Sequence, residues 1–428
     1  MIRLPISQIG QSGRTFGVWQ AELLAGNLSV TKMQTPSSPA SASPFPVLLR
    51  DCIEESLRYV LSSFVEDKLG TTELGLSKQY CSQLLRDEGD NHLDSKDAAD
   101  TSGVAFYPLY KRVASTLSGC IVSGNSLRAS HKIESTQETE LIEQQENEWN
   151  RLISDKGLAL ALKAVEFELH VQEPFFTQLR EGLKTVEGRC AVGNYNRIAQ
   201  GDLLLLNKCL LLEVQCVGHY SSFSELLKTE GLAKVLPGIE TVDEGIQVYR
   251  NFYTEEKEKT NGVRGISVSR LADQPYMHVS SILAGLGYSG MASTVGLVQT
   301  AGTVLNALPP SRSALLSSFI VPYQQNVKGS TLTNGARALS KHVSRSSNCW
   351  WGGFFGNDHD KNQIALKVTS HLITNCCWMN VHITQPHGPV FEVRVGEGYG
   401  ARWSQDGSKF IGFLEPYTQD GYCKGWKN

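Results

Sequence analysis

The stretch GLKTVEGR (residues 182–189) decides how the centre of this chain folds. It begins a predicted strand and contains Lys184, Glu187 and Arg189. Side chains alternate along a strand, so Glu187 and Arg189 share one face, and Lys184 joins them only if the chain bends at Gly188 or at the strand start. A carboxylate between two cations holds both and leaves N–H donors for a ligand phosphate, carbonyl or carboxylate. The pattern predicts a binding cleft; the alternative is a surface ion network worth under about 1 kcal/mol.

Predicted strands and helices surround this stretch on both sides. The first are a strand within Ala164–Val171, a helix after Glu173-Pro174 and a strand at Thr185–Val192. Two strands follow at Leu203–Leu206 and Leu210–Val217, joined by Asn207-Lys208. Capping boxes at Ser222 and Thr241 then open two helices, and the last strand is at Val263–Val268. This order and length are typical of one small barrel capped by helices.

The motif Gly-x-Lys-x-x-Glu-x-Arg at 182–189 and the stretch Glu230–Val263 resemble the ASCH domain, whose fold is related to the PUA RNA-binding domain. The likeness is to single-domain archaeal members, and the full-length arrangement is similar to plant proteins described as RNA-binding ASCH domain proteins. The resemblance implies a PUA-like β-barrel at 163–271 and a role in RNA metabolism or transcription coregulation. It implies that RNA or a nucleotide binds in a cleft containing Lys184, Glu187, Arg189 and Arg197.

A bacterial branch of the ASCH family implies an enzymatic alternative, an amidohydrolase acting on N4-acetylcytidine. Its catalytic set is a Lys in this motif, a Thr three residues later and a distant Glu. Lys184 matches the Lys, Glu187 stands where the Thr would be, and Glu230 lies in the region of the distant Glu. Because Glu187 favours the ammonium form, we expect a raised pKa for Lys184, which works against a nucleophilic lysine. We therefore expect binding rather than catalysis; a third alternative is a protein-interaction scaffold with a vestigial cleft.

Charge limits how RNA could be held. Residues 164–270 contain twelve Lys or Arg against fifteen Asp or Glu, and the net charge of the whole chain is −3. A domain that is not basic cannot hold RNA by counterion release alone, so we expect a small pocket for a base or a nucleotide end. Tyr195, Tyr220 and Tyr249 are candidates to stack a base, although for Tyr249 we favour a place in the core.

The whole chain is predicted to have an α+β fold in five parts. These are a Ser- and Pro-rich disordered tail at 1–46, a helical region with a polar linker at 47–162, the PUA-like ASCH barrel at 163–271, a small-residue-rich helical connector at 272–327, and a small α/β unit at 328–428. The N-terminal helices are a candidate surface for protein partners.

The last part is rich in Trp and in cations. It holds five of the seven tryptophans and eleven Lys or Arg against seven Asp or Glu, a composition that suits a nucleic-acid surface. In GYGARW (398–403) we predict that Arg402 and Trp403 bind a ligand, with a tight hairpin of a small β domain as the alternative. Trp378 and Phe391 are expected in the core.

Cysteines and apolar segments indicate the compartment. The ten cysteines show no Cys-x-x-Cys pair, so we expect reduced, mostly buried thiols and neither a metal nor a cofactor. The segment between Asp273 and Arg312 has no charged residue, but Gly, Ser and Thr make it too polar to span a membrane. We expect an intracellular protein of the cytoplasm or nucleus; organelle targeting by the tail is a minor alternative.

Overall fold

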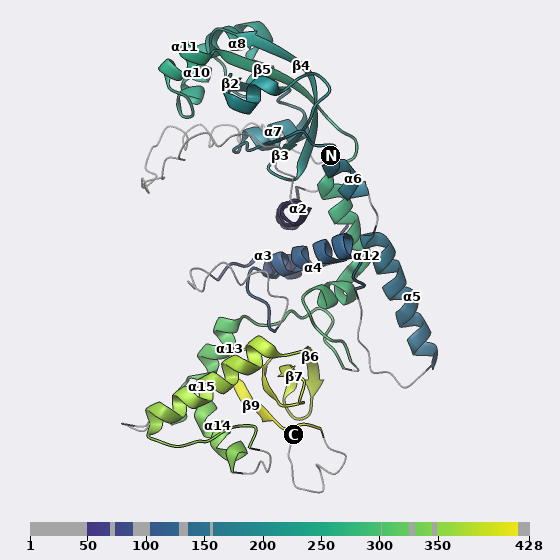
Figure 1. The fold of residues 1–428 in the computed structure, drawn as a ribbon, viewed down its shortest axis with the longest axis vertical. Helices are drawn as coiled ribbons and strands as arrows, with labels where there is room; N and C mark the ends of the chain where they lie inside the picture. Colours follow the sequence, from purple (N-terminus) through teal and green to yellow (C-terminus); the bar gives the residue numbers. More distant parts are fainter. Residues whose placement is uncertain are drawn as a thin grey trace, which may run out of the picture. The chain divides into compact units, whose positions relative to one another are not determined.

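The computed structural model describes residues 49–68, 73–88, 103–127, 136–154, 157–300, 302–324, 329, 331–344 and 349–417 (Figure 1). The tail predicted at 1–46 and most of the polar linker predicted at 87–104 lie outside these residues.

A group of helices precedes the sheets, as the apolar periodicity predicts. Its members are α2 (Leu49–Val65), α3 (Lys78–Leu85), α4 (Leu109–Ser123), α5 (Thr136–Ile153) and α6 (Gly157–Lys163), and α12 (Pro275–Thr294) packs against α2, α4, α5 and α6. Helix α2 buries Ile53, Leu57, Val60 and Leu61. Helix α12 is kinked at Gly287, whose φ of 54° favours glycine. Among the described residues, no helix is both long enough and apolar enough to cross a membrane.

A curled five-stranded sheet follows, confirming the α+β class (Figure 1). Its strands are β1 (Phe167–Leu169), β2 (Val186–Cys190), β3 (Leu203–Leu206), β4 (Leu210–Tyr220) and β5 (Val263–Arg270), in the order β1-β3-β4-β5-β2. Strands β1 and β3 are parallel and the other pairs are antiparallel. Helix α7 (Phe175–Glu181) and the short 3-10 helix η2 (Gly193–Arg197) lie on either side of β2 in the sequence.

The segment between β4 and β5 differs from the prediction of two helices. It contains four: α8 (Phe223–Glu230), α9 (Leu232–Val235), α10 (Val242–Arg250) and α11 (Glu255–Asn261). Gly231, with a φ of 88°, separates α8 from α9, and Thr254 caps a new helix by accepting from the amide of Lys257. The predicted capping box at Thr241 is complete, with its partner Glu244.

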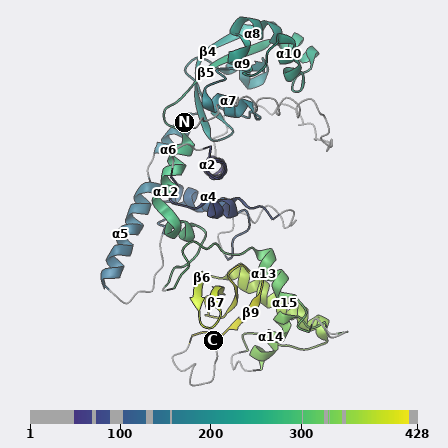
Figure 2. The ribbon, with the colours of Figure 1, turned by 180° about the vertical axis from the view of Figure 1, so that it is seen from behind.

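The last described part combines three helices with a second sheet (Figure 2). The elements are α13 (Arg312–Phe319), α14 (Asn334–Val343), α15 (Asp358–Asn375), β6 (Trp378–Thr384), β7 (Gly388–Arg394), β8 (Gly400–Ser404) and β9 (Phe410–Leu414). The four strands form an antiparallel meander in the order β6-β7-β8-β9, with α15 packed against β7 and β8. The predicted hairpin with Asp406-Gly407 in its turn is present between β8 and β9.

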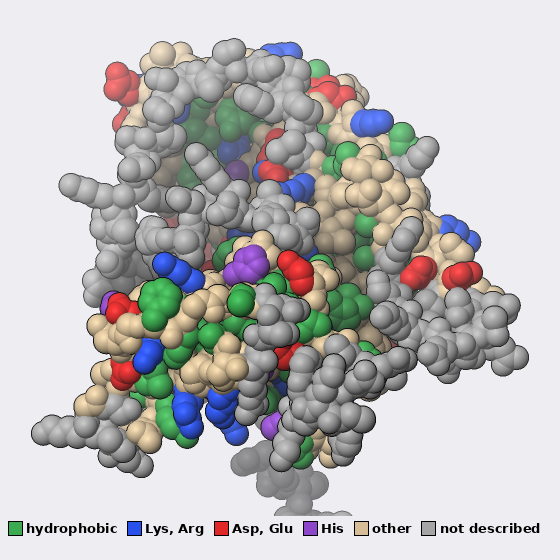
Figure 3. Space-filling model, turned by 60° about the horizontal axis from the view of Figure 1, so that its bottom comes forward, with side chains coloured by type: hydrophobic (Ala, Val, Ile, Leu, Met, Phe, Trp, Pro, Cys, Tyr) green, Lys and Arg blue, Asp and Glu red, His purple; other side chains and the backbone are tan. Residues whose placement is uncertain are grey.

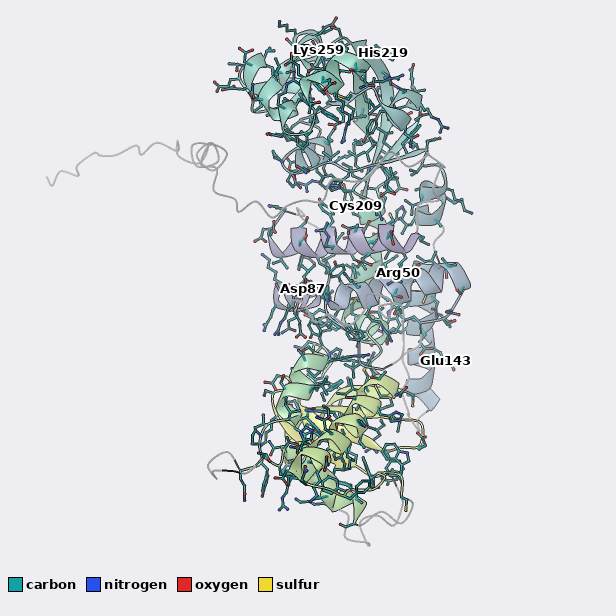
Figure 4. All side chains as sticks on the ribbon, turned by 60° about the vertical axis from the view of Figure 1, so that its left-hand side comes forward. Arg50, Asp87, Glu143, Cys209, His219 and Lys259 are labelled. Carbon is teal, nitrogen blue, oxygen red and sulfur yellow. The ribbon has the colours of Figure 1, made fainter. Side chains whose placement is uncertain are left out.

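The described cysteines are free thiols, and six of the nine are buried, as predicted. Cys209 lies at the turn between β3 and β4 (Figure 4), where burial raises its pKa to about 12. Burial therefore keeps this sulfur protonated and unreactive at neutral pH.

Alanine substitutions at two helical glycines should change the stability of the fold in opposite directions. At Gly335, in α14, an added Cβ would lie 1.9 Å from the ring of Phe319, whereas at Gly119, in α4, it would meet no atom within 4 Å. We expect Gly335→Ala to lower the free energy of unfolding by about 1–3 kcal/mol through overpacking. Gly119→Ala should raise it by up to about 1 kcal/mol through helix propensity. Urea unfolding measures both; equal midpoints for the two variants would contradict the packing around Gly335.

Candidate functional site

Strand β2 brings the three charged side chains of the motif together. The Glu187 carboxylate accepts from Arg189 Nε at 2.7 Å and lies 3.1 Å from Lys184 Nζ. The β2–β5 register is regular through Gly188, so the predicted bend is at the strand start. Lys184 precedes β2 by two residues, which frees its side chain from the strand alternation and allows it to reach Glu187.

The ammonium of Lys184 is fully engaged inside the protein. Its Nζ donates to the carbonyl of Val186 at 2.9 Å and to the carbonyl of Val235, in addition to Glu187, and the side chain is 2% exposed. The expectation of a raised pKa is wrong: burial lowers the pKa of Lys184 and outweighs the opposing effect of Glu187. Three acceptors around one nitrogen nevertheless match the three N–H bonds of an ammonium.

Arg189 faces the opening beside this pair. Its Nη2 donates to the carbonyl of His170 at 2.8 Å, and its guanidinium lies 5.6 Å from the centre of the Tyr195 ring. Burial opposes the charge of Arg189, but Glu187 raises the pKa above the ordinary arginine value. Burial also disfavours the Glu187 carboxylate, but Lys184 and Arg189 together lower its pKa. Glu187 and Arg189 are therefore charged at neutral pH.

These charges lie at the wall of a cavity of about 270 Å³. Besides the motif residues Lys184, Glu187, Gly188 and Arg189, the lining consists of His170, Val171, Gln172, Phe175, Tyr195, Leu236, Tyr249, Phe252 and Tyr253. Aromatic rings with a few convergent polar groups are typical of small-molecule sites, which usually measure about 300–1,000 Å³. This cavity has room for a ligand the size of one base or nucleoside.

Gly188 has no room for a side chain, because residues of α8 and α10 approach β2 closely at this point. A Cβ on Gly188 would lie 2.3 Å from the Tyr249 hydroxyl and 2.8 Å from a methyl group of Leu226. Tyr249 is 6% exposed and its ring stacks on Phe223 at 3.9 Å, so the core expectation for this tyrosine is confirmed. Glycine at 188 thus lets α10 pack against the strand that forms the site.

The structure places other predicted residues outside this cavity. Arg197 is exposed at the end of η2, and Glu230 accepts a hydrogen bond from the Tyr220 hydroxyl; neither lines the cavity. In the second sheet, Arg402 and Trp403 point to opposite faces, as neighbours in a strand must. The Trp403 indole is fully buried and donates to the carbonyl of Leu315 at 3.2 Å.

Seven lining residues were not predicted, among them His170, Phe175, Phe252 and Tyr253. Phe252 and Tyr253 follow the end of α10 at Arg250, and Phe252 is 45% exposed. In the sequence, the signal for these two residues was an aromatic pair directly before Thr254, which caps the next helix. Within the described ranges, no group of three or more His, Cys, Asp and Glu side chains converges as metal ligands do.

Comparison with known proteins gives two family matches. Residues 169–271 match the ASCH domain, and residues 322–415 match the CdiA C-terminal tRNase toxin domain. No protein of curated function matches the chain.

Two solved structures match the central region. The crystal structure of the hypothetical protein PH0355 is 37% identical in sequence, covers 24% of this chain and 98% of its own, and has a TM-score of 0.24. The solution NMR structure of PF0455 from Pyrococcus furiosus is 40% identical, covers 25% of this chain and 98% of its own, and has a TM-score of 0.23. The chain belongs to the ASCH domain proteins. The predicted ASCH resemblance is confirmed by the family match at residues 169–271.

Removing the central carboxylate of the ASCH site should destabilise the fold. Glu187→Gln leaves Lys184 and Arg189 buried without their counter-charge, so we expect the free energy of unfolding at pH 7 to fall by about 3 kcal/mol. The folded pKa of Glu187 is lowered, so its carboxylate stabilises the fold above the unfolded glutamate pKa of about 4.3. This contribution is lost as the pH falls through the folded pKa.

The difference in the free energy of unfolding between Glu187→Gln and wild type should therefore be smaller in acid. Urea unfolding at pH 7 and at about pH 3 measures this difference. Glu181→Gln is the control, because Glu181 is exposed and pairs with the neighbouring Arg180, so its loss should change stability by less than about 0.5 kcal/mol. A deficit that does not depend on pH would contradict the ionic role of Glu187.

Proposed function

We propose that this ASCH domain protein binds RNA through the aromatic cavity beside β2, which takes one base or nucleotide. The observation that carries the proposal is the convergence of Lys184, Glu187 and Arg189 at the wall of that cavity. Two cations and one carboxylate give the wall a local charge of +1, which suits a phosphate. Phe175, Tyr195, Phe252 and Tyr253 supply rings on which a base can stack.

The charge of the chain as a whole favours a pocket over a groove. Lys and Arg side chains lie beside Asp and Glu on the face seen in Figure 3, and the net charge of the chain is −3. Such a surface gives little affinity by counterion release. Stacking and a few directed hydrogen bonds must then supply most of the binding energy, as in the recognition of single-stranded RNA. The match of residues 322–415 to a tRNase toxin domain supports a nucleic-acid partner.

Binding is favoured over hydrolysis by the state of Lys184. Its nitrogen is engaged by three acceptors and its side chain is 2% exposed, so the amine is not accessible for attack on an acyl group. Glu230 does not line the cavity that would hold the substrate. Release of acetate from N4-acetylcytidine by the wild-type chain, lost in Glu187→Gln but kept in Glu181→Gln, would instead support the amidohydrolase alternative.

Phe252 allows binding to be tested without disturbing the core, because its ring lines the cavity and is 45% exposed. We expect Phe252→Ala to weaken binding of a fluorescently labelled single-stranded RNA by about 5- to 100-fold, since one stacked base is worth about 1–3 kcal/mol. Fluorescence anisotropy measures the dissociation constants.

Phe355→Ala is the matched control, because Phe355 is 72% exposed and does not line the cavity. Equal affinities of wild type and Phe252→Ala would place RNA binding elsewhere. The absence of RNA binding by the folded wild-type chain would favour a scaffold.

A further inference from the structure

A second cavity lies where the ASCH sheet meets the helices α2 and α12. It measures about 370 Å³ and has no lining residue in common with the cavity beside β2. Its lining includes Tyr59 of α2, Arg180 of α7, Arg270 at the end of β5 and Ser280 of α12. The volume is within the range of small-molecule sites, about 300–1,000 Å³. Elements from distant parts of the sequence thus enclose a hollow with room for a mononucleotide.

The cations of this cavity outnumber its carboxylates. Arg180 Nη2 donates to Glu181 at 2.9 Å, and Lys68 pairs at 2.6 Å with Glu66, which lies outside the lining. Among the described residues, Arg270 forms no ion pair, and its side chain donates only from Nη1, to the carbonyl of Arg180 at 3.0 Å. Even with Glu66 counted, the group has a net charge of +1. Arg270 carries this charge, and its Nε and Nη2 keep donors for a ligand.

The charged groups of the cavity are open to solvent. Arg270 is exposed, and the side chain of Lys68 is 62% exposed. The carbonyl bond of Arg270 fixes one end of its guanidinium, so the exposed donors are already oriented. Guanidinium groups bind phosphate oxygens in pairs through parallel N–H bonds. An anion from solution can therefore reach Arg270 without any rearrangement of the core.

Aromatic and apolar side chains complete the lining. The Arg180 guanidinium lies 5.4 Å from the centre of the Tyr59 ring, and Tyr59 meets Tyr276 edge to face with the ring centres 5.1 Å apart. Met277, which is 47% exposed, adds an apolar side chain. Cations beside aromatic rings suit a ligand that has an anionic group and a planar ring.

Ser280 adds a hydroxyl that the protein does not use. The neighbouring Ser281 donates to the carbonyl of Met277 at 3.0 Å. The Ser280 hydroxyl has no hydrogen-bond partner among the described residues, although the residue is only 7% exposed. Buried polar groups nearly always have such a partner. Because Ser280 lines the cavity, an acceptor on a bound ligand would supply it.

We propose that this cavity between α2, α7, β5 and α12 binds the phosphate monoester of a nucleotide. A phosphate monoester carries a charge of about −1.5 to −2 at neutral pH and three acceptor oxygens, whereas a carboxylate has one charge and two oxygens. Arg270 binds the phosphate, and Tyr276 and Met277 contact the base or the sugar. A free nucleotide and the 5′ end of an RNA present the same group. The proposal does not rest on RNA binding by the cavity beside β2.

The test titrates the full chain with adenosine 5′-monophosphate and with adenosine, which differ only in the phosphate, by calorimetry. We expect the monophosphate to bind at least about 10-fold more tightly, because hydrogen bonds to charged groups are worth about 1.5–3 kcal/mol. Arg270→Gln should weaken its binding by about 10- to 100-fold for the same reason. Arg151→Gln is the control, because Arg151 is exposed on α5 and lines neither cavity.

Met277 offers a second test that does not disturb the fold. Met277→Glu places a carboxylate in the lining, and Met277→Gln has nearly the same shape without the charge. We expect Met277→Glu to bind the monophosphate about 5-fold or more weakly than Met277→Gln, through repulsion between like charges. Position 277 is in the first turn of α12, where an acidic side chain stabilises a helix. Met277→Glu should therefore unfold at no lower temperature than Met277→Gln.

A 5′-phosphorylated single-stranded RNA, compared with the same RNA ending in a 5′-hydroxyl, separates the two sources of phosphate. Binding of the monophosphate supports a free nucleotide. A preference for the phosphorylated RNA that Arg270→Gln abolishes, without binding of the monophosphate, supports an RNA end.

The proposal is wrong if the folded wild-type chain prefers neither phosphorylated ligand, if Arg270→Gln binds as Arg151→Gln does, or if Met277→Glu binds as Met277→Gln does. Phe252→Ala should keep the affinity of the Arg270 site for the monophosphate, because Phe252 does not line this cavity. Binding of the monophosphate that is lost in Phe252→Ala but kept in Arg270→Gln would place it in the ASCH cavity and overturn the second site alone.

Discussion

The ASCH site depends on the Glu187 carboxylate, which holds two buried cations in place. Through Lys184 it ties the start of β2 to the end of α9, because the same ammonium donates to the carbonyl of Val235. Through Arg189 it ties β2 to the segment before α7, at the carbonyl of His170. One carboxylate therefore fixes three segments that are far apart in the sequence. The position of the cavity wall follows from this network rather than from the sheet alone.

This arrangement divides the tasks of the three charged groups. Lys184 has no exposed donor and serves as a counter-charge, whereas Arg189 lies over Tyr195 at the cavity. A ligand would therefore meet one guanidinium and several rings, and not an open row of cations. Affinity built in this way depends less on salt than binding along a basic groove, because few counterions are released.

Much of the fold could be predicted because its signals are local. Alternation placed Glu187 and Arg189 on one face, and the capping residues Ser222 and Thr241 marked helix starts. The direction of the Lys184 pKa shift could not be predicted, because it depends on burial beneath residues of α7 and α9, and the spacing of the motif does not reveal that burial. The ion pairs around Glu392 in the second sheet were missed for a related reason, because Glu392 and His382 meet only through the register of β6 and β7.

The ion-pair network around Glu187 resembles the one around Glu392, but the two networks differ in their third partner. In each, a buried carboxylate orients cationic groups: Glu187 from the edge strand β2, and Glu392 from the interior strand β7. In the ASCH domain the remaining partner is an ammonium with every proton engaged, which can hold charge but cannot exchange a proton. In the second sheet the remaining partner is the imidazole of His382, whose Nε2 lies 3.3 Å from Glu392 Oε2. The first network lines the ASCH cavity, whereas the second ties β6, β7 and β8 together through Glu392.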